Sequence, residues 1–202
     1  MLEIIHRADI NPSRVAVLPG AFNPPTVAHL KMARAALRHA DEVVWVLPRG
    51  FPHKSFDGAG FADRSRMLKL VAGAEPGFSA AVSDGGLYAE IAAEAEAFYG
   101  PAAQIALVCG RDAAERIASW DYGTPGVFDS MVRRYRLLVA SRAGDYIPPA
   151  EHADRITSMQ LAPGADGVSS SNVRRLIAAG MPWEHLVPLP IVDLVRRLYR
   201  LN

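Results

Sequence analysis

The chain is poor in cysteine and in long apolar runs. Cys109 is the one cysteine among 202 residues, so neither an intrachain disulfide nor a cysteine-based zinc site can form. No apolar segment approaches the ~20 residues that a transmembrane helix requires. The N-terminus lacks the basic start and apolar run of a signal peptide. We therefore expect a cytoplasmic protein without a membrane partner.

An excess of one charge is also missing, since 22 Lys and Arg stand against 21 Asp and Glu, a net charge of +1. This balance gives no broad attraction to a nucleic acid polymer. The P-loop consensus, a G-x-G-x-x-G after the first apolar strand, H-E-x-x-H and G-x-S-x-G are all absent. P-loop enzymes, ordinary dinucleotide-binding domains, zinc hydrolases and α/β-hydrolases are thereby disfavoured.

Short apolar runs alternate with helical patterns along the chain. Continuous apolar strands are expected at residues 15–18, 43–47, 78–82, 104–109, 136–140 and 156–161. Because these runs are apolar throughout, they indicate strands buried on both faces of a parallel sheet. We predict an α/β fold: a doubly wound, Rossmann-like parallel sheet of five to six strands with helices on both faces. Ligands of such sheets bind at the carboxyl ends of the strands.

Helices are expected between and after these strands. Apolar spacing and end signals place them at residues 27–38 (or to 40), 61–73, 87–98, 128–134, 169–179, 183–187 and 192–201, with a short helix leading to Trp120. Residues 1–14 form a lead-in to which the pattern assigns no structure. Neither a repeat nor a linker is evident, which favours a single domain.

Residues 15–30, VAVLPGAFNPPTVAHL, have the pattern of a strand, a tight loop and a helix start. Thr26 is the expected N-cap, and His29 lies on the same face of the first helical turn. A helix N-terminus after a parallel strand favours phosphate. The simpler alternative is a capping threonine beside a packed histidine.

A second group suited to phosphate opens the helix expected at residues 169–179. Ser169, Ser170 and Ser171 gather hydroxyls at its start, and Arg174 follows about one turn later. Free N–H groups, hydroxyls and a guanidinium together suit a phosphate. Ordinary N-capping with a solvated arginine is the alternative.

Four other positions lie in or after the loops that follow expected strands. Gly110 and Asp112 come after residues 104–109, where a carboxylate can accept hydrogen bonds from a ribose or cap a helix. Trp120 can stack on a flat ring or pack in a core. Lys54 stands in the loop after the second strand, where it can reach a phosphate.

Five segments together resemble a known family. GAFNPPTVAHL resembles the G-x-F-x-P-x-[HT]-x-G-H signature of the nucleotidyltransferase superfamily, and GVSSSNVR resembles its I-S-S-T-x-I-R motif. PHK at residues 52–54, GRD before Trp120 and LVPLPIVDLVRRLY resemble one branch, the nicotinate/nicotinamide mononucleotide adenylyltransferases. The resemblance covers nearly the whole chain. It implies one nucleotidyltransferase domain over residues 1–202, with residues 181–202 as closing C-terminal helices.

The activity implied by the resemblance is transfer of AMP from ATP to nicotinate or nicotinamide mononucleotide, with release of pyrophosphate, in NAD biosynthesis. Its partners would be ATP and a pyridine mononucleotide, with Mg²⁺ carried by ATP and a homo-oligomer left open. Implied catalytic residues are His29, Thr26, Lys54 and Arg174. Implied nucleotide-binding residues are Gly20, Phe22, Gly110, Asp112, Ser169, Ser170 and Ser171. Trp120 and Asn23 would bind the mononucleotide.

The chain departs from the family pattern at two positions in its first loop. Pro19 stands where a second glycine is usual, and Ala28 replaces the glycine before His29. These two departures leave open a regulatory nucleotide-binding module that has lost catalysis. Thr26, in place of the commoner histidine, and the chain length leave open a phosphopantetheine adenylyltransferase or cytidylyltransferase of the same superfamily.

Overall fold

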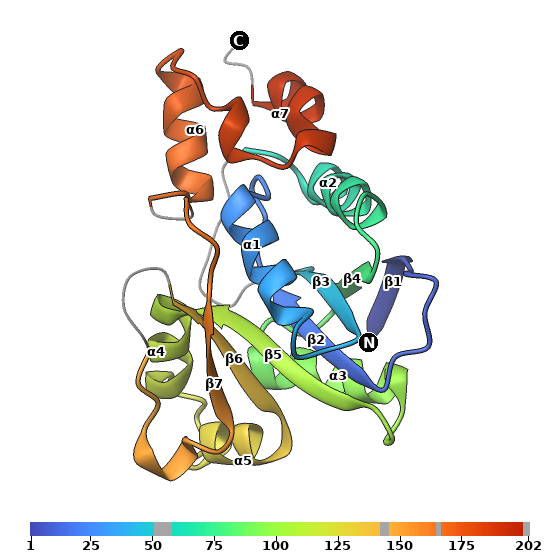
Figure 1. Ribbon diagram of the computed structural model, residues 1–202, viewed down its shortest axis with the longest axis vertical. Helices are drawn as coiled ribbons and strands as arrows, with labels where there is room; N and C mark the ends of the chain where they lie inside the picture. Colours follow the sequence, from blue (N-terminus) through green and yellow to red (C-terminus); the bar gives the residue numbers. More distant parts are fainter. Residues whose placement is uncertain (51–57, 142–145, 165–166, 200–202) are drawn as a thin grey trace.

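A seven-stranded sheet forms the centre of the protein, seen here in a computed structural model that describes residues 1–50, 58–141, 146–164 and 167–199 (Figure 1). Its strands are β1 (Leu2–His6), β2 (Arg14–Pro19), β3 (Glu42–Pro48), β4 (Phe78–Ser83), β5 (Gln104–Gly110), β6 (Arg136–Ser141) and β7 (Ile156–Gln160). The helices are α1 (Val27–Ala36), α2 (Phe61–Gly73), α3 (Tyr88–Tyr99), α4 (Arg111–Ser119), α5 (Val127–Arg134), α6 (Ser170–Ala178) and α7 (Val192–Leu198). Short 3₁₀ turns lie at η1 (Ala150–His152), η2 (Glu184–Leu186) and η3 (Leu189–Ile191).

The strands run in the order β1-β4-β3-β2-β5-β6-β7. β2 to β7 pair in parallel, and β1 pairs antiparallel with β4 at one edge. From β2 the chain builds outward to β3 and β4, and then returns to place β5 on the other side of β2. The predicted doubly wound sheet is confirmed. Its six parallel strands are joined by a seventh, β1, in the lead-in that carried no assignment.

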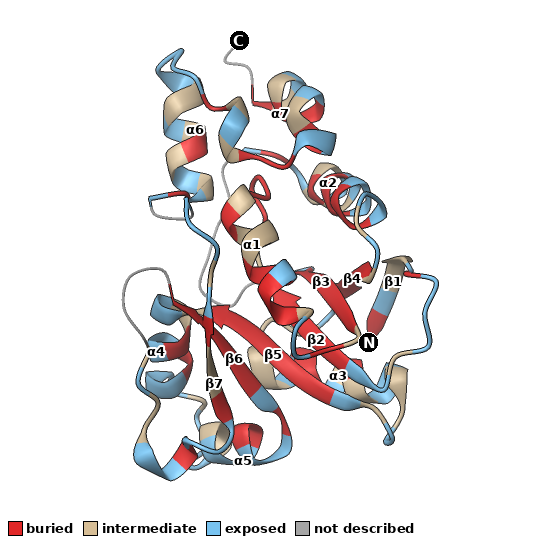
Figure 2. Ribbon diagram, viewed as in Figure 1, coloured by how far each residue is buried: buried red, intermediate tan, exposed pale blue. Residues whose placement is uncertain are grey.

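Helices bury both faces of the sheet, which explains why the strands are apolar throughout. Leu18 and Trp45 face a core that α1, α2 and the C-terminal elements share. Val17 and Val44, the adjacent residues on the same strands, face the core formed with α3, α4 and α5. The central strands are accordingly buried along most of their length (Figure 2).

Three predicted helices are shorter than expected, and one of them, expected at residues 192–201, ends as α7 at Leu198. The helix expected to reach residue 38 or 40 ends at Ala36, because the N–H groups of Arg38 and His39 bond three residues back in a tighter turn. Residues 183–187 form only the 3₁₀ turn η2, since Pro188 keeps Val187 extended. The helix at residues 61–73 is confirmed as α2. None of the helices within the described ranges has the length and apolarity to cross a membrane.

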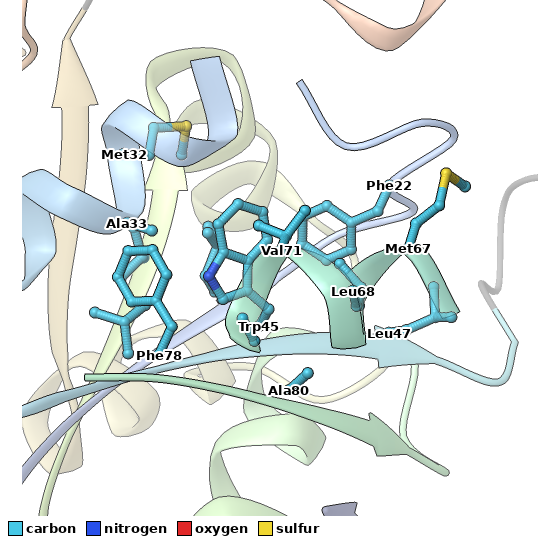
Figure 3. Packing of buried hydrophobic residues seen from close by; sticks show 14 of the residues in the cluster. Phe22, Met32, Ala33, Trp45, Leu47, Met67, Leu68, Val71, Phe78 and Ala80 are labelled. Carbon is cyan, nitrogen blue, oxygen red and sulfur yellow. The ribbon is translucent and has the colours of Figure 1, made fainter. Parts of the chain in front are cut away.

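Trp45, the largest fully buried side chain, contains a buried polar atom that opposes folding. Trp45 has no exposed surface, and its ring packs against Phe22 and Phe78 at centroid distances of 5.3 and 5.9 Å (Figure 3). Its indole Nε1 is buried with no hydrogen-bond partner among the described residues. A buried donor left unpaired opposes folding by about 1–3 kcal/mol.

We therefore expect Trp45→Phe to lower the free energy of unfolding by less than about 1.5 kcal/mol, because the lost packing is offset by removal of the unpaired donor. Trp45→Ala should cost about 3–5 kcal/mol. Urea denaturation of the two variants checks this, and equal losses would contradict the proposed offset.

Candidate active site

A cleft of about 910 Å³ opens at the carboxyl ends of the strands, beside the point where the strand order reverses. This is the location expected for ligands in an open α/β sheet. Many of its lining residues come from the strand ends, the first loop and α4. The predicted site residues among the lining are Gly20, Phe22, Asn23, His29, Gly110, Asp112, Trp120, Ser169, Ser170, Ser171 and Arg174. Lys54 lies outside the described residues.

Thr26 and His29 share one face of the helix start, as their spacing predicts. His29 Nδ1 accepts a hydrogen bond from the Thr26 backbone N–H at 3.1 Å, and the Thr26 hydroxyl lies 2.8 Å from the same nitrogen. Because a backbone N–H can only donate, Nδ1 is the unprotonated nitrogen and Nε2 carries the ring proton. The Thr26 side chain has no exposed surface. It therefore lies against His29 instead of beside it at the cleft, which corrects the expectation of two donors facing a phosphate.

Gly20 and Phe22 form the wall behind His29. The Phe22 ring is buried and meets the His29 ring edge-on, with centroids 5.2 Å apart and planes at 69°. Phe22 has a positive φ of 47°, which turns the chain sharply. A Cβ on Gly20 would stand 2.8 Å from the Phe22 ring. Only glycine therefore fits at position 20 without moving the ring that supports His29.

Asn23 joins three distant parts of the chain. Its Oδ1 accepts from the Ala59 N–H at 3.3 Å and from the Tyr199 hydroxyl. Its backbone oxygen accepts from Arg174 Nη1 at 2.6 Å. Asn23 is only 3% exposed, and its amide oxygen is used within the protein. Tyr199 was missed from the sequence, because nothing in its local pattern indicates a partner so far along the chain.

The start of α6 closes the cleft from the other side. Ser169 caps this helix by accepting the Asn172 N–H at 3.1 Å, which confirms the predicted N-cap. The Ser170 hydroxyl donates to the Pro24 carbonyl at 2.8 Å. The N-terminus of α6 is therefore held against the first loop. The two sets of residues predicted to bind phosphate, around His29 and around Ser169 to Arg174, thus lie at one cleft.

Asp112 and Trp120 lie at the two ends of α4. Gly110 occupies the N-cap position, so Asp112 is in the first turn and is not the cap. Its carboxylate makes no hydrogen bond or ion pair within the described part of the chain, and it is exposed at the cleft. Trp120 follows the helix with 37% of its surface exposed. Both side chains are thus accessible to a ligand.

Sequence reasoning missed the wall formed by the start of α3. Gly86, Leu87 and Tyr88 line the cleft, as does Tyr122 after α4. The N–H groups of Gly86 and Leu87 donate to Glu90 at 2.9 and 3.0 Å. The signal was present in the sequence SDGG, which follows a strand at the same edge of the sheet as the first loop.

Cys109 and Ala28 add no reactivity or obstruction to the cleft. Burial raises the pKa of the Cys109 thiol to about 12, so it stays protonated at neutral pH and is a poor nucleophile. The Ala28 methyl is fully buried and packs with Val168, and Ala28 is not among the residues that line the cleft. The departure from glycine at position 28 therefore fills a small hydrophobic cluster.

Known proteins are similar to this chain over most of its length. The family model described as cytidylyltransferase-like matches residues 17–176. A protein of Treponema pallidum (strain Nichols) named "Probable nicotinate-nucleotide adenylyltransferase" is 32% identical, over 93% of this chain and 99% of its own. A protein of the same name from Gloeobacter violaceus is 28% identical, over 91% and 94%.

Solved structures show the same fold. The Plasmodium falciparum nicotinic acid mononucleotide adenylyltransferase complexed with NaAD has a TM-score of 0.73 at 17% identity, covering 94% of this chain and 98% of its own. The same enzyme complexed with APC has a TM-score of 0.71 at 16% identity, with the same coverage.

Removing the Tyr199 hydroxyl tests the junction at Asn23. We expect Tyr199→Phe to lower the free energy of unfolding by about 1–3 kcal/mol, because the buried Asn23 oxygen loses the donor that Tyr199 supplies. Thermal and urea denaturation measure the loss. Amide hydrogen exchange at Ala59 should also accelerate, whereas unchanged exchange and stability would contradict the role of this contact.

Proposed function

The chain belongs to the cytidylyltransferase-like family, as an adenylyltransferase of NAD biosynthesis, and from this premise we propose how its cleft works. A phosphate oxygen of the pyridine mononucleotide attacks the α-phosphorus of ATP, and the bond to the bridging oxygen of pyrophosphate breaks. The observation that carries this proposal is the meeting of two helix starts, α1 and α6, with His29 and Arg174 at one cleft.

Catalysis rests on position and charge, since no side chain need form a covalent intermediate. The starts of α1 and α6 both present positive partial charge to a triphosphate. His29 donates through Nε2 to the phosphate oxygens whose charge grows in the transition state. Thr26 acts behind it, keeping Nδ1 as the acceptor and the ring fixed.

Arg174 binds the phosphates that depart as pyrophosphate. Its guanidinium is oriented by the Asn23 carbonyl and lies 3.4 Å from the Ser171 hydroxyl. A guanidinium held in place loses less entropy when it binds a phosphate. Lys54 retains its predicted role as an assisting cation from the loop after β3.

The two nucleosides lie at the α4 side of the cleft. Asp112 accepts hydrogen bonds from the adenosine ribose, and Gly110 allows its close approach. Trp120 stacks on the pyridine ring, and Gly86 and Leu87 line the same cleft. We take nicotinate mononucleotide as the preferred acceptor, because the curated relatives carry that name.

Magnesium enters with ATP in this proposal. Within the described residues no group of three or more His, Cys, Asp or Glu side chains is placed to hold a metal. Such a cleft fits an ion bound mainly by triphosphate oxygens and water, the usual arrangement for Mg²⁺. When bound, the ion neutralises phosphate charge. We also propose that residues 1–202 act as one nucleotidyltransferase domain that residues 181–202 close.

The test is incubation of the protein with ATP, Mg²⁺ and either nicotinate or nicotinamide mononucleotide. Pyrophosphate release and dinucleotide formation are followed together. We expect turnover with both products in equal amounts and a higher kcat/KM for nicotinate mononucleotide. If neither acceptor supports turnover, the proposed reaction is refuted. A higher kcat/KM for nicotinamide mononucleotide would refute only the choice of nicotinate mononucleotide as the preferred acceptor.

His29→Ala should lower kcat at least about 100-fold, because it removes a donor that acts in the transition state. Thr26→Val should lower kcat by about tenfold with little change in KM, since one contact that orients the ring is lost. Thr26→Ser keeps the hydroxyl and is the matched control. A near-normal rate for His29→Ala would remove His29 from the mechanism.

Trp120→Ala should raise the KM for the mononucleotide by about fivefold or more, since base–aromatic stacking contributes about 1–3 kcal/mol. The KM for ATP should stay close to that of the unmodified protein. Trp120→Phe retains a ring and should recover part of the loss. An equal rise in both KM values would place Trp120 outside the pyridine site.

A further inference from the structure

A second hollow lies at the opposite edge of the sheet, where the strands begin. It has a volume of about 580 Å³ and shares no lining residue with the catalytic cleft. Its most frequent lining residue is arginine, contributed by Arg14, Arg38, Arg134, Arg136 and Arg155. We propose that this hollow binds the phosphate group of a small phosphorylated molecule, at a site separate from catalysis.

The arginines come from distant segments that the parallel sheet brings together. Arg14 begins β2, and its strand partner is Gln104 at the start of β5. Arg136 begins β6 and is paired with Ala106. The Arg155 carbonyl accepts the Leu137 N–H at 3.0 Å, which brings the start of β7 alongside (Figure 1). Since parallel strands begin at one edge, the side chains at these starts line one hollow.

Three of the five guanidinium groups are already paired with carboxylates. The pairs are Arg14 with Asp41 at 2.6 Å, Arg134 with Glu96 at 2.7 Å and Arg155 with Asp154 at 3.1 Å. The Arg14 guanidinium donates hydrogen bonds to Asp41 and holds the pKa of that carboxyl well below its ordinary value. These three ion pairs leave little uncompensated charge on Arg14, Arg134 and Arg155.

Arg38 and Arg136 supply the charge that lacks a partner. Neither forms an ion pair within the described part of the chain, and both are exposed. Arg38 lies two residues after the end of α1. Two unpaired guanidinium groups match the dianion of one phosphate, which arginine binds through parallel N–H donors. His39 and Gln104 line the same hollow and offer further polar contacts.

A small ligand fits this hollow better than a polymer. Its volume is in the range of small-molecule sites. The chain as a whole has a net charge of only +1, so it has no extended positive field for a nucleic acid. Pro101, Ala103 and Ile105 give the hollow an apolar wall for the rest of a ligand.

The test uses ¹H–¹⁵N NMR titration with inorganic phosphate, and then with AMP, at constant ionic strength. We expect saturable shifts of the backbone amides of Gln104, Ile105 and Arg136. Arg38→Gln with Arg136→Gln should weaken this binding at least about tenfold, because both unpaired donors are lost. If AMP binds more tightly than inorganic phosphate, the hollow recognises a nucleotide. If the two bind with equal affinity, the hollow recognises only the phosphate group.

The matched control is Arg66→Gln with Arg197→Gln, which removes the same charge from exposed arginines outside both the cleft and the hollow. It should bind phosphate at the hollow as the unmodified protein does. Shifts at Gly20 and Gly110 report the catalytic cleft and should persist in both double variants. The single variants Arg38→Gln and Arg136→Gln serve if the double variant does not fold.

Three outcomes would overturn the proposal. The strand-start amides could fail to shift, or their shifts could rise linearly without saturation. Alternatively, the control variant could weaken binding as much as Arg38→Gln with Arg136→Gln does, which would indicate only a general charge effect. Loss of adenylyl transfer would bear on the catalytic cleft and not on this site.

Discussion

The parallel pairing of β2 with β5 is the constraint on which the rest of the structure depends. Because the chain builds outward from both strands, the loops after β2 and β5 diverge to opposite faces and leave a cleft between them. The same pairing sets the register of the strand starts, so that Arg14 and Arg136 line one hollow at the opposite edge. Two separate polar surfaces thus follow from one choice of strand order.

The cleft is held by hydrogen bonds between segments far apart in the chain. Asn23 receives donors from Ala59, Arg174 and Tyr199, and Pro24 receives the Ser170 hydroxyl. The first loop therefore acts as the junction for α6 and the C-terminal segment. Its own interior is packed closely, with Phe22 under Gly20 and against His29. A phosphate-binding surface made of loops becomes rigid in this way, which suits catalysis by position and charge.

Several predictions from local pattern were confirmed because they depend on neighbouring residues. Apolar runs predicted the buried strands, and Ser169 was found as the N-cap of α6. Predictions that needed distant contacts were incomplete. β1 pairs at the edge through a strand some eighty residues away, as the partners Leu2 and Ser83 show. Thr26 had the correct spacing, yet its burial behind His29 depended on how the loop packs.

The sequence by itself determined the fold class, the family and many of the residues that line the cleft, because these depend on apolar periodicity and on short ordered motifs. Only the tertiary structure decided which nitrogen of His29 carries the proton. It also decided that the Asn23 side-chain oxygen accepts hydrogen bonds from the Ala59 N–H and the Tyr199 hydroxyl. It further decided that Arg38 and Arg136 line the same hollow without an ion pair to any described carboxylate. Hydrogen bonds and charge pairs depend on distances of a few ångströms between residues remote in the chain, and spacing along the sequence does not contain those distances.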